Sequence, residues 1–198
     1  MLKSMRLLFI AIGVLVVAAF AVEAPRTTPA RGAESRLAGA MFTADGRLQR
    51  PVDYRDWQFV SAGLGMSYGP AAQAAALTGH VMFDNVFVQP QAYKAFLETA
   101  VWPEGTMFVL ELRGSETKRP PNNHGHFQTD VHGVEVSLKD SRRFKDRWAY
   151  FDFGMEAQTA TPEANANCFD CHRRHAAVDM TFVQFYPTLQ NSKTQLQH

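Results

Sequence analysis

The chain has 198 residues, of which 46% are hydrophobic and 12% aromatic, enough to build the core of one ordinary domain. Its formal net charge is +1 and its basic residues form no polybasic tract, so nothing in the composition indicates a nucleic-acid partner. Two cysteines in a chain of this length exclude a scaffold built from disulfide bonds.

The N-terminal residues have the organisation of a signal peptide. A basic start, MLKSMR, precedes sixteen apolar residues, Leu7 to Val22, fewer than the roughly 20 that span a bilayer. Ala19-Phe20-Ala21 supplies a small-x-small cleavage pattern, so residues 1–21 are expected to be a signal peptide. An uncleaved membrane anchor is the alternative. In either case the rest of the chain is expected outside the cytoplasm, in a periplasm.

Composition divides the rest of the chain into three parts. Residues 22–40 are rich in Pro, Arg, Thr and Ala without apolar periodicity, which predicts a flexible leader. Residues 41–191 are predicted to form one folded domain, and residues 192–198 a polar tail.

Most of the folded domain is predicted to be β-strand, because short segments rich in β-branched and aromatic residues follow one another. In chain order these segments are residues 57–66, 81–88, 106–113, 133–140 and 147–154. Residues 119–127 form a loop by composition. Residues 89–102 carry an apolar stripe at helical spacing, and residues 162–177 predict a second helix with Pro162 in its first turn. We therefore expect an α+β domain, mainly antiparallel sheet with flanking helices.

Both cysteines lie in CFDCHRRH, Cys168 to His175. A structural zinc site is one reading, but four ligands within eight residues could hardly surround a tetrahedral ion. A thiol–disulfide exchange site is another, but the strand-then-helix context is weak and Asp170 disfavours a thiolate. The pattern C-x-x-C-H is also the attachment signature of c-type haem, which the sequence favours over both.

Haem attachment gives each residue of this pattern a role. Residues three apart share one face of a helix, so Cys168 and Cys171 can both form thioether links to one porphyrin, and His172 can bind its iron. Export agrees with this reading, since bacterial c-type haem is attached outside the cytoplasm. We therefore expect one covalently attached haem c.

The position of the motif indicates whether the iron has a second protein ligand. Only 26 residues follow His172, and Met180 is too near in the chain to reach the opposite face of the haem. We therefore expect a five-coordinate iron, suited to ligand binding or catalysis. Four-helix cytochromes c′ also have such an iron, but the strand-rich segments before Cys168 exclude a helical bundle.

Three segments resemble the cytochrome P460 family and its relative, the β-sheet cytochrome c′ (cytochrome c′-β). They are PVDYRDW, GVEVSLKDSRRF and CFDCHRRHAAVDMTFVQFYP, within a resemblance that spans residues 47–187. The resemblance implies an antiparallel sheet with helices around one c-type haem. P460 enzymes oxidise hydroxylamine to nitrous oxide and carry a lysine cross-link from a strand to the haem. The c′-β proteins lack this link and bind nitric oxide or carbon monoxide in an apolar pocket.

The position of that lysine separates the two branches. By motif order Leu110 stands where the lysine would be, and leucine has no nucleophilic nitrogen with which to form the link. By strand alternation Phe108 and Leu112 face the same side as Leu110, which gives the expected pocket an apolar wall. The resemblance therefore favours the ligand-binding c′-β branch.

Other residues are candidates through the resemblance. Phe127 could cap the distal face, as aromatic residues do in c′-β proteins, or could be a core residue. Glu163 stands five residues before Cys168, where some P460 enzymes have a proton-relaying carboxylate; the alternative is an ordinary first-turn glutamate. Asp84 replaces a pocket arginine of the P460 enzymes, which weakens the enzyme hypothesis.

The sequence therefore predicts a periplasmic mono-haem c-type cytochrome whose five-coordinate iron binds nitric oxide or a similar small ligand. A P460-type oxidoreductase acting on hydroxylamine or nitric oxide and a one-electron carrier are the alternatives. The partners to consider are the small ligand, a periplasmic redox partner and, as in many family members, a second copy of the chain.

Overall fold

The computed structural model describes residues 39–66, 81–164 and 166–189. The expected signal peptide, nearly all of the expected leader and the expected polar tail lie outside these ranges. Within the described ranges, no helix is both long enough and apolar enough to cross a membrane.

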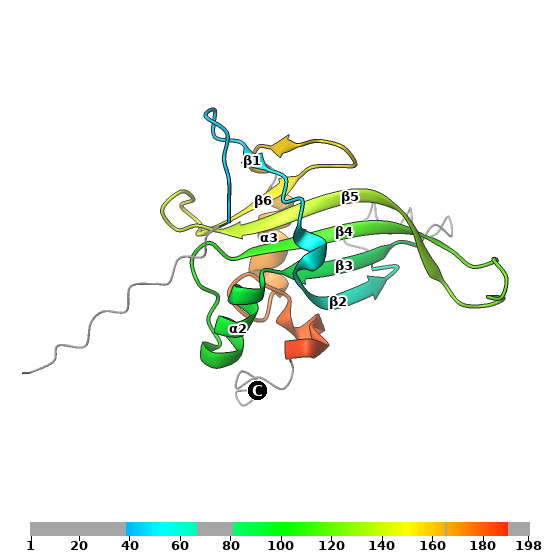
Figure 1. Cartoon of the computed structure of the whole chain (residues 1–198). Helices are drawn as coiled ribbons and strands as arrows, with labels where there is room; N and C mark the ends of the chain where they lie inside the picture. The colour runs from blue at the N-terminus through cyan, green and yellow to red at the C-terminus, as the bar shows by residue number, and fades with distance from the viewer. Residues whose placement is uncertain (1–38, 67–80, 165, 190–198) are drawn as a thin grey trace, which may run out of the picture. The chain divides into compact units, whose positions relative to one another are not determined.

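A five-stranded antiparallel sheet is the main element of the fold, with its strands in the order β2-β3-β4-β5-β6 (Figure 1). The strands are β2 (Gln58–Leu64), β3 (Phe83–Val88), β4 (Met107–Glu116), β5 (Phe127–Lys139) and β6 (Trp148–Asp152). Each of the five predicted strand segments forms one of them. Every strand pairs with its neighbour in the chain, and β4 is central.

Short elements complete the described part of the chain. The helices are α2 (Pro90–Thr99) and α3 (Ala166–His175), and the 3-10 turns are η1 (Tyr54–Asp56), η2 (Val183–Phe185) and η3 (Pro187–Leu189). A separate two-stranded pair joins β1 (Leu48–Gln49) to β7 (Thr159–Ala160). The predicted α+β class is confirmed.

Two boundaries differ most from the prediction. Strand β5 begins at Phe127 rather than Gly133, because residues 127–132 alternate between half-buried and exposed positions and extend the pairing with β4. Helix α3 begins at Ala166, so Pro162 does not start it. The backbone N–H of Glu163 instead donates to the carbonyl of Tyr150 (2.7 Å), which holds the chain beside β6 before the helix begins.

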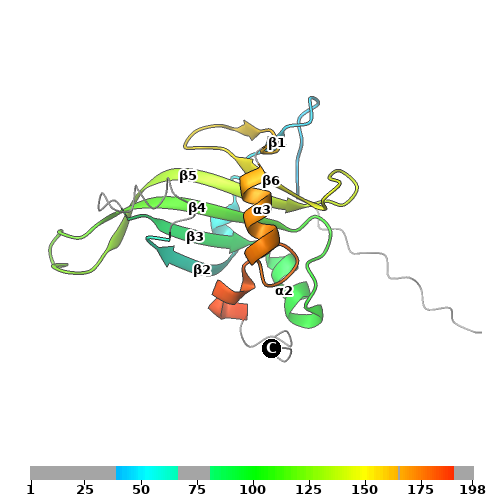
Figure 2. The same cartoon turned by 180° about the vertical axis from the view of Figure 1, so that it is seen from behind.

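One face of the sheet is covered by the first residues of the domain. Figures 1 and 2 place η1 and β1 on this face and α3 on the opposite one. On β4 the residues Met107, Val109 and Glu111 point to the η1 side and are at most 2% exposed. The apolar cluster on this side contains Leu48, Tyr54, Met107, Val109, Val134, Val136, Leu138, Ala149, Phe151, Phe153 and Ala160.

The opposite face has a second, aromatic cluster near α2. The ring of Trp102 stacks on Phe96 (3.8 Å between centroids) and meets Phe108 edge-on (4.8 Å), while Trp148 and Tyr186 contact the other side of Phe108. Stacked and edge-on pairs of this kind stabilise an aromatic core. The cluster fills one end of this face, and α3 contacts β6 on the same side, where the His172 ring meets that of Tyr150.

A buried carboxylate links the start of the domain to the central strand. Glu111 of β4 is 2% exposed and accepts hydrogen bonds from Tyr54 (2.5 Å), Arg55 (2.8 Å) and Arg113 (2.5 Å). Burial alone would raise the pKa of Glu111, but the hydrogen bonds from Arg113, Tyr54 and Arg55 outweigh it and lower the pKa to about 2. The ionised carboxylate therefore ties η1 to β4.

The substitution Glu111→Gln should lower the free energy of unfolding at pH 7 by about 3 kcal/mol, because it removes the charge that pairs with both arginines. The folded pKa lies below the ordinary value, so this stability is present above about pH 5 and is lost as the pH falls towards 2. Urea unfolding at pH 7 and pH 3 measures both effects.

Glu116→Gln is the matched control for this experiment. Glu116 lies on the same strand, is half-exposed and meets Arg119 only at 3.7 Å, so its loss should change the free energy of unfolding by less than about 1 kcal/mol. An equal loss from both variants would contradict the role given to Glu111.

Candidate functional site

Helix α3 carries both cysteines and lies across the side of the sheet opposite η1 (Figure 2). Cys168 and Cys171 are free, partly buried and one helical turn apart, so their side chains share a face of the helix. His172 follows directly and is also partly buried. Two thiols and one imidazole are thus presented together by a single turn.

The ring of His172 is held on both faces and at one nitrogen. It lies 4.5 Å from the ring of Tyr150 and 4.5 Å from that of Phe182, measured between centroids. Its Nδ1 is 2.7 Å from the carbonyl oxygen of Met180, which can only accept, so Nδ1 carries the proton. Burial lowers the pKa of His172, which favours the neutral ring. In this tautomer Nε2 has a free lone pair and can bind a metal.

The setting of Cys168 argues against thiol–disulfide exchange. Burial raises the pKa of the Cys168 thiol, and the charges of Glu135, Glu163 and Asp152 raise it further. A raised pKa keeps the sulfur protonated, whereas exchange needs a thiolate. Within the described ranges, no three His, Cys, Asp or Glu side chains are grouped closely enough to hold a metal ion.

Three strands form a wall on the α3 side of the sheet, and strand pairing identifies its members. Residues directly opposite each other on neighbouring strands share a face. We call this set the α3-side wall: Asp84, Val86, Val88, Phe108, Leu110, Leu112, Gly133, Glu135 and Ser137. Leu110 and Leu112 are only partly buried although β4 is the central strand. The apolar part of the wall is therefore free to contact a cofactor.

Two polar atoms near the wall lack partners. Asp84 Oδ2 and Tyr150 Oη are buried, and neither finds a hydrogen bond within the described part of the chain. Buried polar atoms normally have a partner, and a prosthetic group with polar edges would supply one. A haem fits these features together: two free thiols, an oriented imidazole, two partly buried leucines and two buried polar atoms.

Acidic side chains also lie on the wall. Burial, followed by the charges of Asp152, Asp84 and Glu163, raises the pKa of Glu135 to about 7. Burial raises the pKa of Asp84 to about 6. Glu135 is paired with Leu110 across β4 and β5, so a carboxyl group that can exchange a proton near neutral pH stands beside the apolar position.

Glu135 was missed by the sequence analysis, although a signal for it was present. In GVEVSLKD, alternation puts Val134, Val136 and Leu138 on one face and Glu135 on the other. A carboxylate in the middle of such a strand, on the face of the expected pocket, is itself an indication of function.

The structure brings some predicted site residues together and leaves others apart. Glu163 lies in the segment before α3 with an exposed side chain, and its charge acts on both Cys168 and Glu135. Leu110 lies on the α3-side wall, opposite Val86 of β3. Phe108 is on the same wall but is 4% exposed and belongs to the aromatic cluster, as a core residue does.

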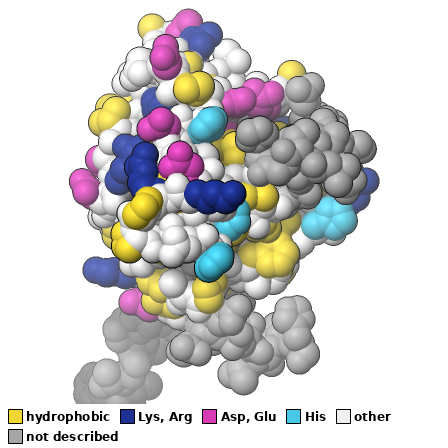
Figure 3. All heavy atoms as spheres, turned by 90° about the vertical axis from the view of Figure 1, so that its right-hand side faces the viewer, with side chains coloured by type: hydrophobic (Ala, Val, Ile, Leu, Met, Phe, Trp, Pro, Cys, Tyr) yellow, Lys and Arg dark blue, Asp and Glu magenta, His cyan; other side chains and the backbone are white. Residues whose placement is uncertain are grey.

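Phe127 lies away from the other candidates. It begins β5 and pairs with Glu116 near the end of the long β4–β5 hairpin, where the Arg119 guanidinium lies 5.7 Å from its ring. Eight residues of strand, roughly 26 Å, separate it from Glu135. The loop histidines His124 and His126 beyond it are exposed. On the side of the molecule towards which this hairpin extends, basic, acidic, histidine and hydrophobic side chains are interspersed (Figure 3).

One family model matches the chain. The model described as Cytochrome P460 covers residues 51–183, which include all five strands of the main sheet, both cysteines and His172. A search of curated proteins finds no match.

Glu135→Gln should make the folded protein more stable at alkaline pH. The folded pKa of Glu135 lies above its ordinary value, so the native state loses stability as the pH rises from about 4.5 to about 7. Glutamine has no such loss, so the variant should gain about 1 to 2 kcal/mol over the parent at pH 8 and differ little at pH 4.

Thermal unfolding at pH 4, 6 and 8 checks this expectation. Glu98→Gln, at an exposed position of α2, is the control and should leave the pH profile of the parent unchanged. A Glu135→Gln profile parallel to that of the parent would show that Glu135 has an ordinary pKa.

Proposed function

Because the chain belongs to the cytochrome P460 family, whose cofactor is haem, we propose that it is an exported protein with one haem c whose five-coordinate iron binds nitric oxide or a similar small ligand. Cys168 and Cys171 would hold the haem through thioether links, and His172 would bind its iron through Nε2. The proposed location is the periplasm, which rests on the signal-peptide pattern of residues 1–21.

The composition of the α3-side wall carries this proposal. None of its nine described residues is a lysine, methionine or histidine, so the wall offers no amine for a cross-link and no thioether or imidazole for the iron. Lys139, which follows on the same face of β5, is bound to Asp179 and to the carbonyl of Trp102. Leu110 and Leu112 supply apolar surface that excludes water from a small ligand. When bound, a five-coordinate haem supplies an iron with one open position.

Three further residues position the ring of His172. Tyr150 and Phe182 hold the plane of the His172 ring, and the carbonyl of Met180 fixes its tautomer. Met180 therefore contributes its backbone carbonyl to the setting of His172.

Mass and spectrum together test the proposal. Protein matured in a host that attaches c-type haem should weigh one haem more than its polypeptide, and the ferrous protein should show a high-spin spectrum at an ordinary c-type position. That spectrum should shift when nitric oxide is added. His172→Gln should alter the spin state, whereas His175→Gln, three residues further and exposed, should match the parent.

Two results would contradict the proposal. A mass equal to that of the bare polypeptide would show that no haem is attached. A low-spin spectrum that nitric oxide leaves unchanged would indicate a second protein ligand and favour a one-electron carrier.

A P460-type oxidoreductase acting on hydroxylamine or nitric oxide is the second candidate, and the carboxyl groups near the wall favour it. Glu135 and Asp84 have raised pKa values, and the Glu163 charge acts on Glu135, so these groups could hold and release protons near neutral pH. This candidate predicts that hydroxylamine is consumed and that Glu163→Gln slows its consumption by tenfold or more, whereas Glu98→Gln does not. Absence of turnover with an oxidant present would exclude it.

A further inference from the structure

The proton on His172 Nδ1 is held by a tight turn that is itself unusual. The carbonyl oxygen of Met180 accepts the hydrogen bond from His172 Nδ1, with 2.7 Å between the two atoms. Met180 and the preceding Asp179 both have positive φ angles, 64° and 42°. Val178 and Thr181 close the turn through backbone hydrogen bonds in both directions (3.3 and 2.8 Å). Non-glycine residues in the left-handed region cost free energy, so this conformation persists only where its surroundings hold it.

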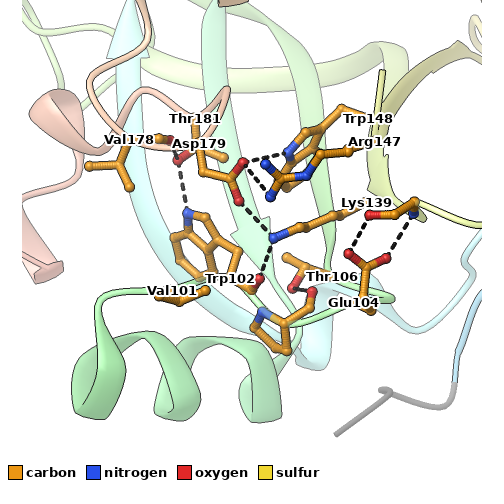
Figure 4. A network of polar contacts seen from close by, with 12 residues as sticks. Val101, Trp102, Glu104, Thr106, Lys139, Arg147, Trp148, Val178, Asp179 and Thr181 are labelled. Atoms are coloured by element: carbon orange, nitrogen blue, oxygen red, sulfur yellow. Dashed lines mark hydrogen bonds and ion pairs between the residues drawn. The ribbon is translucent and has the colours of Figure 1, made fainter. Parts of the chain in front are cut away.

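A buried ion pair provides that hold. The Lys139 ammonium donates to the carboxylate of Asp179 (2.8 Å) and to the carbonyl of Trp102 (2.6 Å), and the Lys139 side chain is 4% exposed (Figure 4). The other carboxylate oxygen of Asp179 accepts a hydrogen bond from the indole N–H of Trp148 (3.3 Å) and forms an ion pair with the guanidinium of Arg147 (3.2 Å). A buried charge with few partners fixes geometry, because a displaced partner leaves the charge uncompensated.

A second anchor holds the far side of the turn. Thr181 is 3% exposed, and its hydroxyl donates to the carbonyl of Val178 (2.6 Å) while accepting the indole N–H of Trp102 (2.9 Å). Figure 4 shows both anchors converging on residues 178–181 from the end of β5 and the segment after α2. The two tryptophans belong to the buried aromatic cluster, so their N–H groups link the turn to the core of the domain.

We propose that Lys139, Asp179 and Thr181 are positioning residues that tune the iron ligand by fixing the carbonyl that accepts the His172 Nδ1 proton. A histidine that donates its second N–H to a well-placed acceptor is a more basic metal ligand, and its ring cannot rotate. This inference rests on the proposed function, since it takes His172 as the ligand. It also gives a role to Lys139 of GVEVSLKDSRRF, a segment that the sequence singled out without assigning one.

The test separates tuning from simple stabilisation. In Lys139→Met and in the near-isosteric Asp179→Asn and Thr181→Val, the hydrogen bond from His172 should weaken. The iron–histidine stretching frequency of the ferrous protein, measured by resonance Raman, should then shift downwards. The midpoint potential should shift upwards, because a less basic ligand stabilises the oxidised iron less.

Matched controls accompany these variants. Thr181→Ser keeps the hydroxyl and should restore the parent frequency and potential. Lys145→Met removes an exposed lysine from the turn between β5 and β6 and should change neither. Lower thermal stability in folded Asp179→Asn and Thr181→Val with unchanged frequency and potential would overturn the inference, whether or not Lys139→Met folds.

Haem content, measured first by mass and absorbance, distinguishes failure of the inference from failure of the proposed function. If the parent carries no haem, the proposed function fails and the tautomer of His172 is measured by ¹⁵N NMR of the unloaded protein. The inference then expects a proton on Nδ1 in the parent and a mixture of tautomers in Thr181→Val. An identical tautomer in both proteins would overturn it.

Discussion

The alternation of side chains along β4 is the constraint on which the rest of the molecule depends. Successive residues of this central strand point to opposite faces, so Glu111 is enclosed with arginines and a tyrosine while its neighbours Leu110 and Leu112 face α3. A shift of one residue in register would bury two leucines among ionic groups and place a carboxylate on the apolar wall. The ionic cluster therefore specifies which residues of β4 belong to the α3-side wall, although none of its own members lies on that face.

The side of the site that holds His172 depends on longer-range contacts. The imidazole belongs to α3, its acceptor to the turn at Met180, and the groups that hold this turn to the end of β5 and the segment after α2. The sheet thus acts on the site twice, through the wall of β3, β4 and β5 and through Lys139 at the end of β5. Under the proposed function these two contributions would control different properties, namely access to the iron and the strength of its bond to His172.

Local patterns in the sequence predicted the strands and helices, but not which side chains from distant parts of the chain lie next to one another. Five strands were recognised from their apolar and aromatic residues, and Cys168, Cys171 and His172 from their spacing. Alternation along β5 already separates Glu135 from its apolar neighbours, but its place opposite Leu110 is a property of pairing between strands. Lys139 was hidden for a similar reason, because its partner Asp179 is distant in the chain. Phe127 was a candidate for the distal face through the resemblance, with a core residue as the alternative, and the length of the β4–β5 hairpin separates it from Glu135.

The order of the strands along the chain has a consequence for biogenesis. Each strand of the main sheet pairs with the strand that precedes or follows it, and the sheet is complete at Asp152, before the cysteines are reached. Hairpins of this kind assemble quickly because their contacts are local. Tyr186 and Leu189, which close the aromatic cluster, come after the attachment motif. The sheet that carries the α3-side wall can therefore be complete while Cys168 and Cys171 are still accessible, and Tyr186 and Leu189 can close the aromatic cluster afterwards.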